Sequence, residues 1–331
     1  MSTSRPKVFI TRRFPQAALD IVAAACDYTM WESDEQPVPR DMLLREAAEA
    51  DGLLTLTSDR IDAELLAAAP RLRVIANTAV GYDNVDLAAM TARGVLLTNT
   101  PGVLTETTAD LAWALLMAAA RRVVEGHKLI EADAWRSWSL MFMVGQDVAG
   151  ATLGVVGAGR IGAAILRRGR GFDMALHYHN RRPNAELEAE TGAIYQPLDD
   201  LLREADFVVV TVPLNAETRG MFGAREFALM QPTSVFVNVA RGPVVDEAAL
   251  YTALQAGRPW AAGLDVFDNE PIRADHPLLS LPNLVATPHV GSGTTKTRVR
   301  MATTAARNLV AALSGQTVPN PVNPEVLGRS A

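Results

Sequence analysis

Short apolar runs alternate with longer amphipathic stretches between Lys7 and Thr98. The apolar runs are KVFI, DGLLTL, RVIANTA and VLLTNT, and the stretches between them, such as 40–50 and 62–69, are rich in Ala, Leu and Glu. Runs of four to six apolar residues are typical of buried strands, and the longer stretches are typical of helices. The pattern therefore predicts a parallel sheet covered by helices.

A second alternating set of elements begins at about Thr152. Its apolar runs are TLGVVG, ALHYHN, DFVVVTV, SVFVNVA, AAGLDVF and NLVAT, and the last ends near Thr287. Between the two sets, residues 105–124 are predicted to form one long helix that leads to the tryptophan-containing segment 135–145. A final helix is predicted over 294–314. The chain thus has an α/β fold with two doubly wound parallel sheets.

The first strand of the second set leads directly into a glycine motif, Gly157-Ala158-Gly159-Arg160-Ile161-Gly162. In a βαβ unit the first glycine permits a tight turn, the second lets the backbone approach a pyrophosphate, and the third allows close packing of helix on strand. The N-terminus of the following helix offers unpaired N–H groups to an anion. Because the motif lies between two strands, we expect it to bind a dinucleotide.

The residues after the second strand of this unit indicate which dinucleotide binds. An acidic residue there would hold the ribose 2′-hydroxyl of NAD, but the strand ends in Asn180-Arg181-Arg182. Two guanidinium groups can bind the 2′-phosphate of NADP, which a carboxylate would repel. We therefore expect NADPH as the cofactor, with NADH as the alternative if the two arginines only form a solvated turn.

Length and chain path suggest two domains. A chain of 331 residues exceeds what one hydrophobic core usually serves. Residues 1–100 and 288–331 are expected to form a discontinuous outer domain, and 101–287 a continuous Rossmann domain. The long helix and the segment 135–145 carry much apolar surface for a monomer, so we expect a homodimer through this region.

Composition narrows the possible partners. The formal net charge of −6 argues against a nucleic-acid-binding or acidic-membrane-binding surface. We find no signal-peptide core or membrane-spanning segment, and the single cysteine, Cys26, fits a reducing compartment. The expectation is a cytoplasmic protein that binds a small molecule, neither nucleic acid nor membrane. The histidines lack the spacing of a zinc site, so no metal is expected.

Polar residues follow several predicted strands of the Rossmann domain. Arg241 follows SVFVNVA, Asp265 follows AAGL, Glu270 lies in the next loop, and His289 follows NLVATP. Ligands of open α/β sheets bind beyond the carboxyl ends of the strands. An arginine, two carboxylates and a histidine gathered there can polarise a carbonyl group and transfer a proton.

At these residues the chain resembles the D-isomer-specific 2-hydroxyacid dehydrogenases, most closely the glyoxylate/hydroxypyruvate reductase branch. The resemblance extends over nearly the whole length. It is carried by VIANTAVGYDNVDL from Val74, TNTPGVLTETTADLAWALL from Thr98, LGVVGAGRIG from Leu153, VNVARGPVVDEAAL from Val237, GLDVFDNEP from Gly263 and TPHVGS from Thr287.

The resemblance implies specific roles for these residues. The catalytic residues would be Arg241, Glu270 and His289. The outer domain would be a flavodoxin-like substrate-binding domain, and the segment expected to form the dimer would be part of the Rossmann domain. Substrate contacts would come from Leu56, Val80, Gly81, Arg241 and Trp138, the last reaching the active site of the second subunit. Cofactor contacts would come from Thr105, the motif Gly157 to Gly162, Asn180, Arg181, Arg182, Val212, Pro213, Thr218, Val239, Ala240, Asp265, His289, Gly291 and Ser292.

The implied reaction is the NADPH-dependent reduction of a small 2-oxo acid, such as glyoxylate or hydroxypyruvate, to a D-2-hydroxy acid. His289 would donate the proton while Glu270 orients its imidazole, and Arg241 would bind the substrate carboxylate. Reduction of 2-ketogluconate, or another D-2-hydroxyacid dehydrogenase activity, remains an alternative because residues 53–57 are not diagnostic. A dinucleotide-sensing corepressor is a further alternative of a different class.

Overall fold

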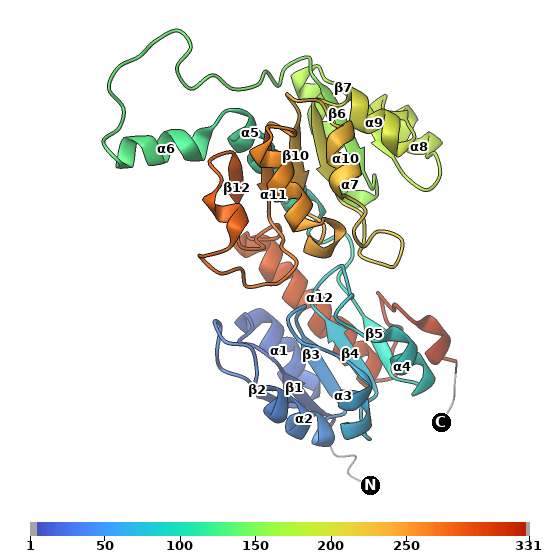
Figure 1. Ribbon diagram of the computed structural model, residues 1–331. Coiled ribbons are helices and arrows are strands. Elements are labelled where there is room, and N and C mark those ends of the chain that lie inside the picture. The colour runs from blue at the N-terminus through green and yellow to red at the C-terminus, as the bar shows by residue number, and fades with distance from the viewer. Residues whose placement is uncertain (1–4, 329–331) are drawn as a thin grey trace. The chain divides into compact units, whose positions relative to one another are not determined.

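The protein consists of two compact units in a computed structural model that describes residues 5–328 (Figure 1). Of the described residues, the first unit contains 5–104 and 293–328, and the second unit contains Thr105–Ser292. Each unit is built on one parallel sheet, with five strands in the first and seven in the second. This arrangement confirms the predicted α/β fold.

In the first unit the strands lie in the order β2-β1-β3-β4-β5. Helices pack on both faces of this sheet. The strands are β1 (Lys7–Ile10), β2 (Asp27–Met30), β3 (Gly52–Thr55), β4 (Val74–Asn77) and β5 (Leu96–Thr98), and the helices are α1 (Gln16–Ala25), α2 (Arg40–Glu49), α3 (Ala63–Ala68), α4 (Leu87–Ala92) and α12 (Thr295–Leu313).

The two faces of this first sheet are covered by different helices because strand side chains alternate. Val8 and Ile10 of β1 share one apolar cluster with α1 and α12, whereas Phe9 shares another with α2, α3 and α4. Helix α12 approaches β3 closely, since a Cβ atom on Gly52 would lie 2.9 Å from Leu309 Cδ1. The last long helix of the chain is therefore part of the core formed by the first strands.

In the second unit the strand order is β12-β11-β10-β9-β6-β7-β8, and every pairing is parallel. The strands are β6 (Thr152–Val156), β7 (Ala175–His179), β8 (Ile194–Tyr195), β9 (Phe207–Val210), β10 (Val235–Asn238), β11 (Ala261–Leu264) and β12 (Leu284–Ala286). The helices are α5 (Thr105–Ala120), α6 (Val123–Glu131), α7 (Arg160–Gly169), α8 (Ala185–Thr191), α9 (Leu198–Glu204), α10 (Ala224–Leu229) and α11 (Glu247–Gln255).

The strand order of this second sheet reverses direction at β6. The chain runs outward from β6 through β7 to β8, and later returns to the other side of β6 as β9. The loops after β6 and β9 therefore separate at a topological switch point, which is the usual ligand-binding position in such sheets. The glycine motif lies directly at this point.

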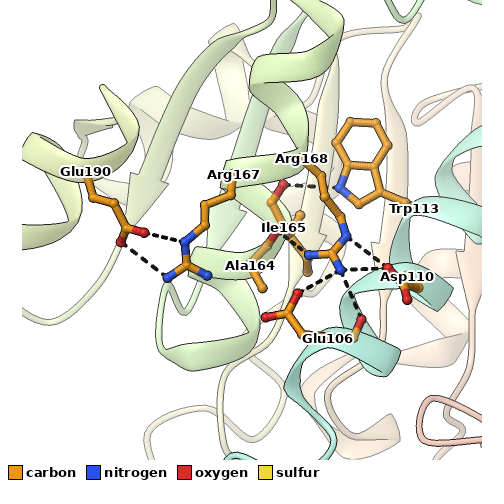
Figure 2. A network of polar contacts seen from close by, with 8 residues as sticks. All are labelled: Glu106, Asp110, Trp113, Ala164, Ile165, Arg167, Arg168 and Glu190. Atoms are coloured by element: carbon orange, nitrogen blue, oxygen red, sulfur yellow. Dashed lines mark hydrogen bonds and ion pairs between the residues drawn. The ribbon is translucent and has the colours of Figure 1, made fainter.

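Helix α7 is fixed to α5 by a polar network (Figure 2). Arg168, near the end of α7, contacts Glu106 Oε2 at 2.8 Å and Asp110 Oδ1 at 2.7 Å, both on α5. A second contact joins the same two helices, because the indole N–H of Trp113 on α5 donates to the Ile165 carbonyl on α7 at 3.1 Å. These contacts set the direction in which the N-terminus of α7 points.

The predicted single helix over 105–124 is wrong in one respect, because it breaks into α5 and α6. Arg122 between them has a left-handed backbone with φ of 53°, and its guanidinium contacts the Glu125 carboxylate at 2.5 Å. The Ala120 carbonyl accepts the Gln146 N–H at 2.9 Å instead of continuing the helix. A short edge strand, β8, was not predicted at all.

The chain passes between the units at slightly different residues than the sequence suggested. The first crossing follows Leu104, and the second follows Ser292, not residue 287. The second crossing is later because Asp265 of the second unit holds the backbone of Val290 and Gly291 by hydrogen bonds. His289 thus belongs to the second unit. Within residues 5–328, no helix combines the length and apolar character needed to cross a membrane.

Candidate active site

Three functional side chains predicted from the sequence lie on loops at one edge of the second sheet. Arg241 follows β10, Glu270 lies in the loop after β11, and His289 follows β12. The start of the Arg241 loop is held by Asn238, which is buried: its amide accepts the Ala240 N–H at 2.9 Å and donates to the Arg241 carbonyl at 3.0 Å. The loop geometry is therefore set by the last residue of the strand.

The imidazole of His289 and the carboxylate of Glu270 form a close pair. His289 Nδ1 lies 2.6 Å from Glu270 Oε2, while Glu270 Oε1 accepts the Phe267 N–H at 2.9 Å. Both side chains are about one-third exposed, at 37% and 34%. Because Nδ1 is engaged by the carboxylate, Nε2 is the ring atom that can exchange a proton with a ligand.

The environment of Glu270 favours its ionised form. Burial alone would raise the pKa of this carboxyl, but the hydrogen bond and charge of His289, the Phe267 N–H and the charge of Arg241 outweigh it. The pKa of Glu270 therefore lies below its ordinary value, and the carboxylate is available to orient the imidazole.

The backbone at His289 adopts a conformation that non-glycine residues rarely take. Its φ is 52°, in the left-handed region, which costs about 1–3 kcal/mol. Asp265 stabilises this turn, because its carboxylate accepts the N–H groups of Val290 and Gly291, each at 2.8 Å. The Asp265 carbonyl also accepts the His289 N–H at 2.9 Å.

The side chain of Asp265 is almost fully buried, with 1% exposure. Burial raises the pKa of this carboxyl, although hydrogen bonds from Thr287 and from the Val290 and Gly291 amides, together with the charge of His289, oppose the rise. The Thr287 hydroxyl donates to Asp265 Oδ1 at 2.7 Å. The side chain of Asp265 thus holds three residues of the loop that carries His289, and its carbonyl holds His289 itself.

The glycine motif has the shape that a pyrophosphate requires. Gly157 has φ of 96°, and a Cβ atom on it would lie 2.7 Å from Val212 N, so only glycine fits where the loops after β6 and β9 meet. By contrast, no atom lies within 4 Å of a Cβ built on Gly159. Gly159 is the N-cap of α7 and offers no side-chain cap to its first amides. These residues fit a dinucleotide, whose phosphates would be held by those amides.

The two arginines after β7 lie on the surface near this motif. Asn180 is tied to it, because its side chain donates to the Ala158 carbonyl at 3.4 Å. The Arg181 side chain is 89% exposed and its guanidinium lies 4.0 Å from the Glu217 carboxylate, which belongs to the turn after β9. Arg182 is also exposed. No acidic residue occupies positions 180–182 at the end of β7.

The other predicted cofactor residues of this unit lie in the loops that follow its strands, in the first turn of α7 or at the start of α5. The Thr218 hydroxyl closes the turn after β9 by donating to the Pro213 carbonyl at 2.6 Å. Gly291 packs beside α5, since its Cβ would lie 3.3 Å from Thr108 Cγ2. The remaining positions are Thr105, Arg160, Ile161, Gly162, Val212, Val239, Ala240 and Ser292.

The predicted substrate residues Leu56, Val80 and Gly81 belong to the first unit, after β3 and β4. Asp59 accepts the Leu56 N–H at 2.8 Å, and Asn84 donates to the Leu56 carbonyl at 3.2 Å. The carbonyls of Val80 and Gly81 accept from Asn99 at 2.9 Å and from Asn77 at 3.1 Å. Both loops are thus held by side-chain amides and a buried carboxylate.

Trp138 is not brought together with the other predicted residues of the second unit. Its side chain lies in the irregular segment after α6 and is 74% exposed. In Figure 1, α6 and the segment after it extend away from the rest of their own unit. The neighbouring apolar residues are also exposed, namely Val123, Ile130, Trp135, Leu140, Met141, Phe142 and Val144.

Sequence reasoning missed the residues that hold the loops in place. Asn238 is a polar residue inside an apolar run, a position that indicates a buried hydrogen-bonding role, whereas Asp59 and Asn84 lie in polar loop sequence that carries no such signal. Their partners are backbone groups of loops whose path no sequence pattern specifies. Among residues 5–328 no cluster of three or more His, Cys, Asp or Glu side chains could hold a metal ion.

Comparison with known proteins gives consistent matches. The sequence model of the family described as "D-isomer specific 2-hydroxyacid dehydrogenase, NAD binding domain" matches residues 113–291. A glyoxylate reductase from Korarchaeum cryptofilum is 48% identical over 98% of this chain and 97% of its own length.

Two solved structures extend this similarity to the fold. The NADPH-dependent glyoxylate/hydroxypyruvate reductase from Sinorhizobium meliloti, in complex with NADP and malonate, has a TM-score of 0.83 and 35% identity, covering 99% of this chain and 100% of that one. A glyoxylate reductase from Paecilomyes thermophila has a TM-score of 0.86 and 30% identity, covering 98% of this chain and 100% of that one.

The Glu270–His289 pair should make stability depend on pH. Because the pKa of Glu270 is lowered in the native state, its contribution is present above its ordinary value of 4.5 and is lost as the pH falls below it. The Tm difference between the native protein and Glu270→Gln should therefore be largest near neutral pH and shrink toward pH of about 3. Thermal melts across this range measure it. A difference that stays constant with pH, or that persists unchanged in a His289→Gln background, would contradict the pairing.

Proposed function

Since the chain belongs to the D-isomer-specific 2-hydroxyacid dehydrogenase family and is an NAD(P)-dependent dehydrogenase, we propose that it reduces glyoxylate and hydroxypyruvate with NADPH. The single observation that carries this proposal is the contact of 2.6 Å between His289 and Glu270 at the edge of the dinucleotide-binding sheet. Relatives named glyoxylate reductase support the choice of substrate.

Arg241 is proposed to bind the substrate carboxylate. A guanidinium can make two parallel hydrogen bonds to a carboxylate, which fixes the orientation of a small 2-oxo acid. Arg241 follows β10 and lies near enough to Glu270 for its charge to lower the pKa of that carboxyl. The same charge would stabilise the negative oxygen that develops when the keto group is reduced.

His289 is proposed to protonate that oxygen from Nε2. Glu270 binds Nδ1 and so keeps the ring in one orientation, with Nε2 directed to the ligand. Asp265 holds the backbone on which the imidazole is mounted. The nicotinamide cofactor, when bound, supplies the reducing equivalent, and the glycine motif would hold its phosphates.

The preference for NADPH is proposed from Asn180, Arg181 and Arg182. Arg181 now makes only a long contact of 4.0 Å to the Glu217 carboxylate. A bound 2′-phosphate would instead accept charge-assisted hydrogen bonds from this guanidinium. The related structure named as NADPH-dependent, from Sinorhizobium meliloti, supports the same preference. The other predicted cofactor residues, Asp265 among them, remain proposed contacts.

In the first unit, Leu56 and the backbone of Val80 and Gly81 are proposed as substrate contacts. Their loops are fixed by Asp59, Asn77, Asn84 and Asn99. A loop that is already fixed can distinguish substrates by size, and no binding free energy is lost in ordering the loop when a substrate binds.

A homodimer is proposed through the apolar segment that includes α6 and residues 132–149. Its exposed Trp138, Leu140 and Met141 side chains are between 73% and 78% accessible. Apolar residues gathered in this way mark an interaction surface, and a second copy of the chain is the usual occupant. Trp138 is proposed to contact the substrate in the partner's active site.

Replacement of the catalytic residues tests the reaction. His289→Ala should lower turnover of glyoxylate by about 10²–10⁴-fold with a smaller effect on KM, because proton transfer is lost. Arg241→Ala should lower kcat and raise KM together. The rate of NADPH oxidation, followed by the absorbance of the reduced nicotinamide, measures both. Arg273→Ala, at an exposed position after Glu270, is the control. Near-normal turnover in either catalytic variant would refute the assignment.

Substrate choice is tested in the same assay with glyoxylate, hydroxypyruvate, 2-ketogluconate and phenylpyruvate. The proposal requires that the first two give the highest kcat/KM. Higher kcat/KM with 2-ketogluconate would assign another dehydrogenase activity, and cofactor binding without turnover of any substrate would favour a dinucleotide sensor.

Cofactor preference is tested by replacing both surface arginines. The Arg181→Ala/Arg182→Ala variant should raise KM for NADPH at least about tenfold, because charge-assisted hydrogen bonds to the 2′-phosphate are lost. KM for NADH should change little. Arg203→Ala, at a half-exposed arginine of α9, is the matched control. Equal effects on the two cofactors, or a native preference for NADH, would end the assignment.

Sedimentation velocity tests the dimer. The native protein should sediment as a dimer at micromolar concentration, and Leu140→Asp/Met141→Asp should produce a monomer because charges are placed in an apolar interface. The control is Ile194→Asp, at an apolar residue of β8 whose side chain is likewise exposed, at 60%. A native monomer, or a dimer that only the control disrupts, would contradict the proposed surface.

A further inference from the structure

Glu247, a residue with no role in the reaction described above, contacts the loop that carries Glu270. It is the first residue of α11. Its Oε1 accepts the Asp268 N–H at 2.8 Å, and its Oε2 lies 3.2 Å from His276 Nε2. The side chains of Glu247 and His276 are 17% and 27% exposed, so this second carboxylate–imidazole pair is largely shielded from solvent.

Glu247 is not needed to cap its own helix. The N-cap of α11 is Asp246, whose carboxylate accepts the N–H groups of Ala248 and Ala249, each at 3.0 Å. One carboxylate is sufficient for these first amides. The contact of Glu247 with Asp268 therefore serves the loop and not the helix.

The ring of His276 lies against this carboxylate with its Nε2 atom, 3.2 Å from Glu247 Oε2. Its Nδ1 accepts the Leu278 N–H at 3.4 Å, which places the ring proton of the neutral form on Nε2. Nε2 faces Glu247 Oε2.

The amide that Glu247 binds is adjacent to the one that binds Glu270. Phe267 N–H donates to Glu270 Oε1 at 2.9 Å, and Asp268 N–H donates to Glu247 Oε1 at 2.8 Å. Glu270 in turn contacts His289. Glu247 is thus linked to the proposed proton donor through the Phe267–Asp268 backbone and Glu270, and His276 contacts Glu247 at the other end of this series.

The same backbone packs against the residue after Arg241. A Cβ atom on Gly242 would lie 1.8 Å from the Phe267 carbonyl carbon and 2.2 Å from Asp268 N. The Phe267–Asp268 peptide is therefore confined between Gly242 on one side and the carboxylate of Glu247, which binds its N–H. Displacing this peptide would disturb the positions of both Arg241 and Glu270.

We propose that Glu247, supported by His276, is a positioning residue that fixes the Phe267–Asp268 peptide and thereby aligns Glu270 and His289 for proton transfer. This inference rests on the proposed function, because it assigns Glu247 to the alignment of groups whose catalytic roles are proposed above. Glu247 acts through the backbone and is not itself catalytic.

Kinetics of Glu247→Ala, Glu247→Gln and Asp246→Ala test the inference. Glu247→Ala should lower kcat for glyoxylate about ten- to a hundredfold with KM changed no more than about twofold, because misalignment by a fraction of an ångström slows the chemical step. Glu247→Gln keeps an oxygen that can accept the Asp268 N–H and should restore kcat to within about threefold. Asp246→Ala removes the helix cap next to it and should lower Tm while leaving kcat unchanged.

Normal kcat in Glu247→Ala, or equal losses of kcat in Glu247→Ala and Asp246→Ala, would overturn the inference. If Glu247→Gln is as impaired as Glu247→Ala, the oxygen that accepts the Asp268 N–H is not what matters, and the inference also fails. If His289→Ala retains turnover, the proposed function fails instead, so the two failures are distinguishable.

A second measurement does not depend on turnover. At neutral pH, Glu270→Gln should lower Tm in the native protein and should lower it by only about half as much or less in the Glu247→Ala variant. The reason is that residues in one hydrogen-bonded network are coupled. The Tm loss caused by Glu270→Gln should be unchanged in the Asp246→Ala background. An unchanged loss in the Glu247→Ala background would refute the alignment of Glu270 by Glu247 even for a protein without the proposed activity.

Discussion

The buried carboxylate of Asp265 determines where the imidazole of His289 can lie. It accepts hydrogen bonds from the two residues after His289 and from Thr287, while its own backbone carbonyl accepts the His289 N–H. Burying a carboxylate is unfavourable without such partners, and a left-handed histidine is unfavourable without a clamp. Each unfavourable feature is compensated by the same set of hydrogen bonds, so the carboxylate and the turn stabilise each other.

The parallel sheet brings these groups together from distant parts of the sequence. Arg241, Asp265 and His289 each follow a strand, and the three strands β10, β11 and β12 are neighbours in the sheet. Carboxyl ends of parallel strands lie at one edge, so residues that directly follow them must lie near each other. The glycine motif follows β6 at the same edge, so one sheet positions both the proposed cofactor site and the proposed proton-transfer pair.

Most of the strands, the glycine motif and the last helix could be predicted from the sequence because each has a local signature, which the two-residue edge strand β8 lacks. Apolar runs such as VFVN define strands, and Thr294 caps α12 by accepting the Thr297 N–H. The break at Arg122 could not be predicted, because the helical pattern continues through it and the Ala120 carbonyl finds its partner only at Gln146. Likewise, Arg241, Glu270 and His289 were recognisable by position, but the contact between Glu247 and Asp268 depends on the path of a loop.

The division of the chain has an evolutionary consequence. Arg241, Glu270, His289 and the glycine motif all lie within the continuous segment Thr105–Ser292, whereas Leu56, Val80 and Gly81 lie in the unit formed by the two ends of the chain. The hydrogen bonds that hold Glu270 and His289 are made by residues of the second unit. Under the proposed roles, selection for a new substrate can therefore act on the Leu56 loop while the residues proposed for proton transfer are inherited unchanged.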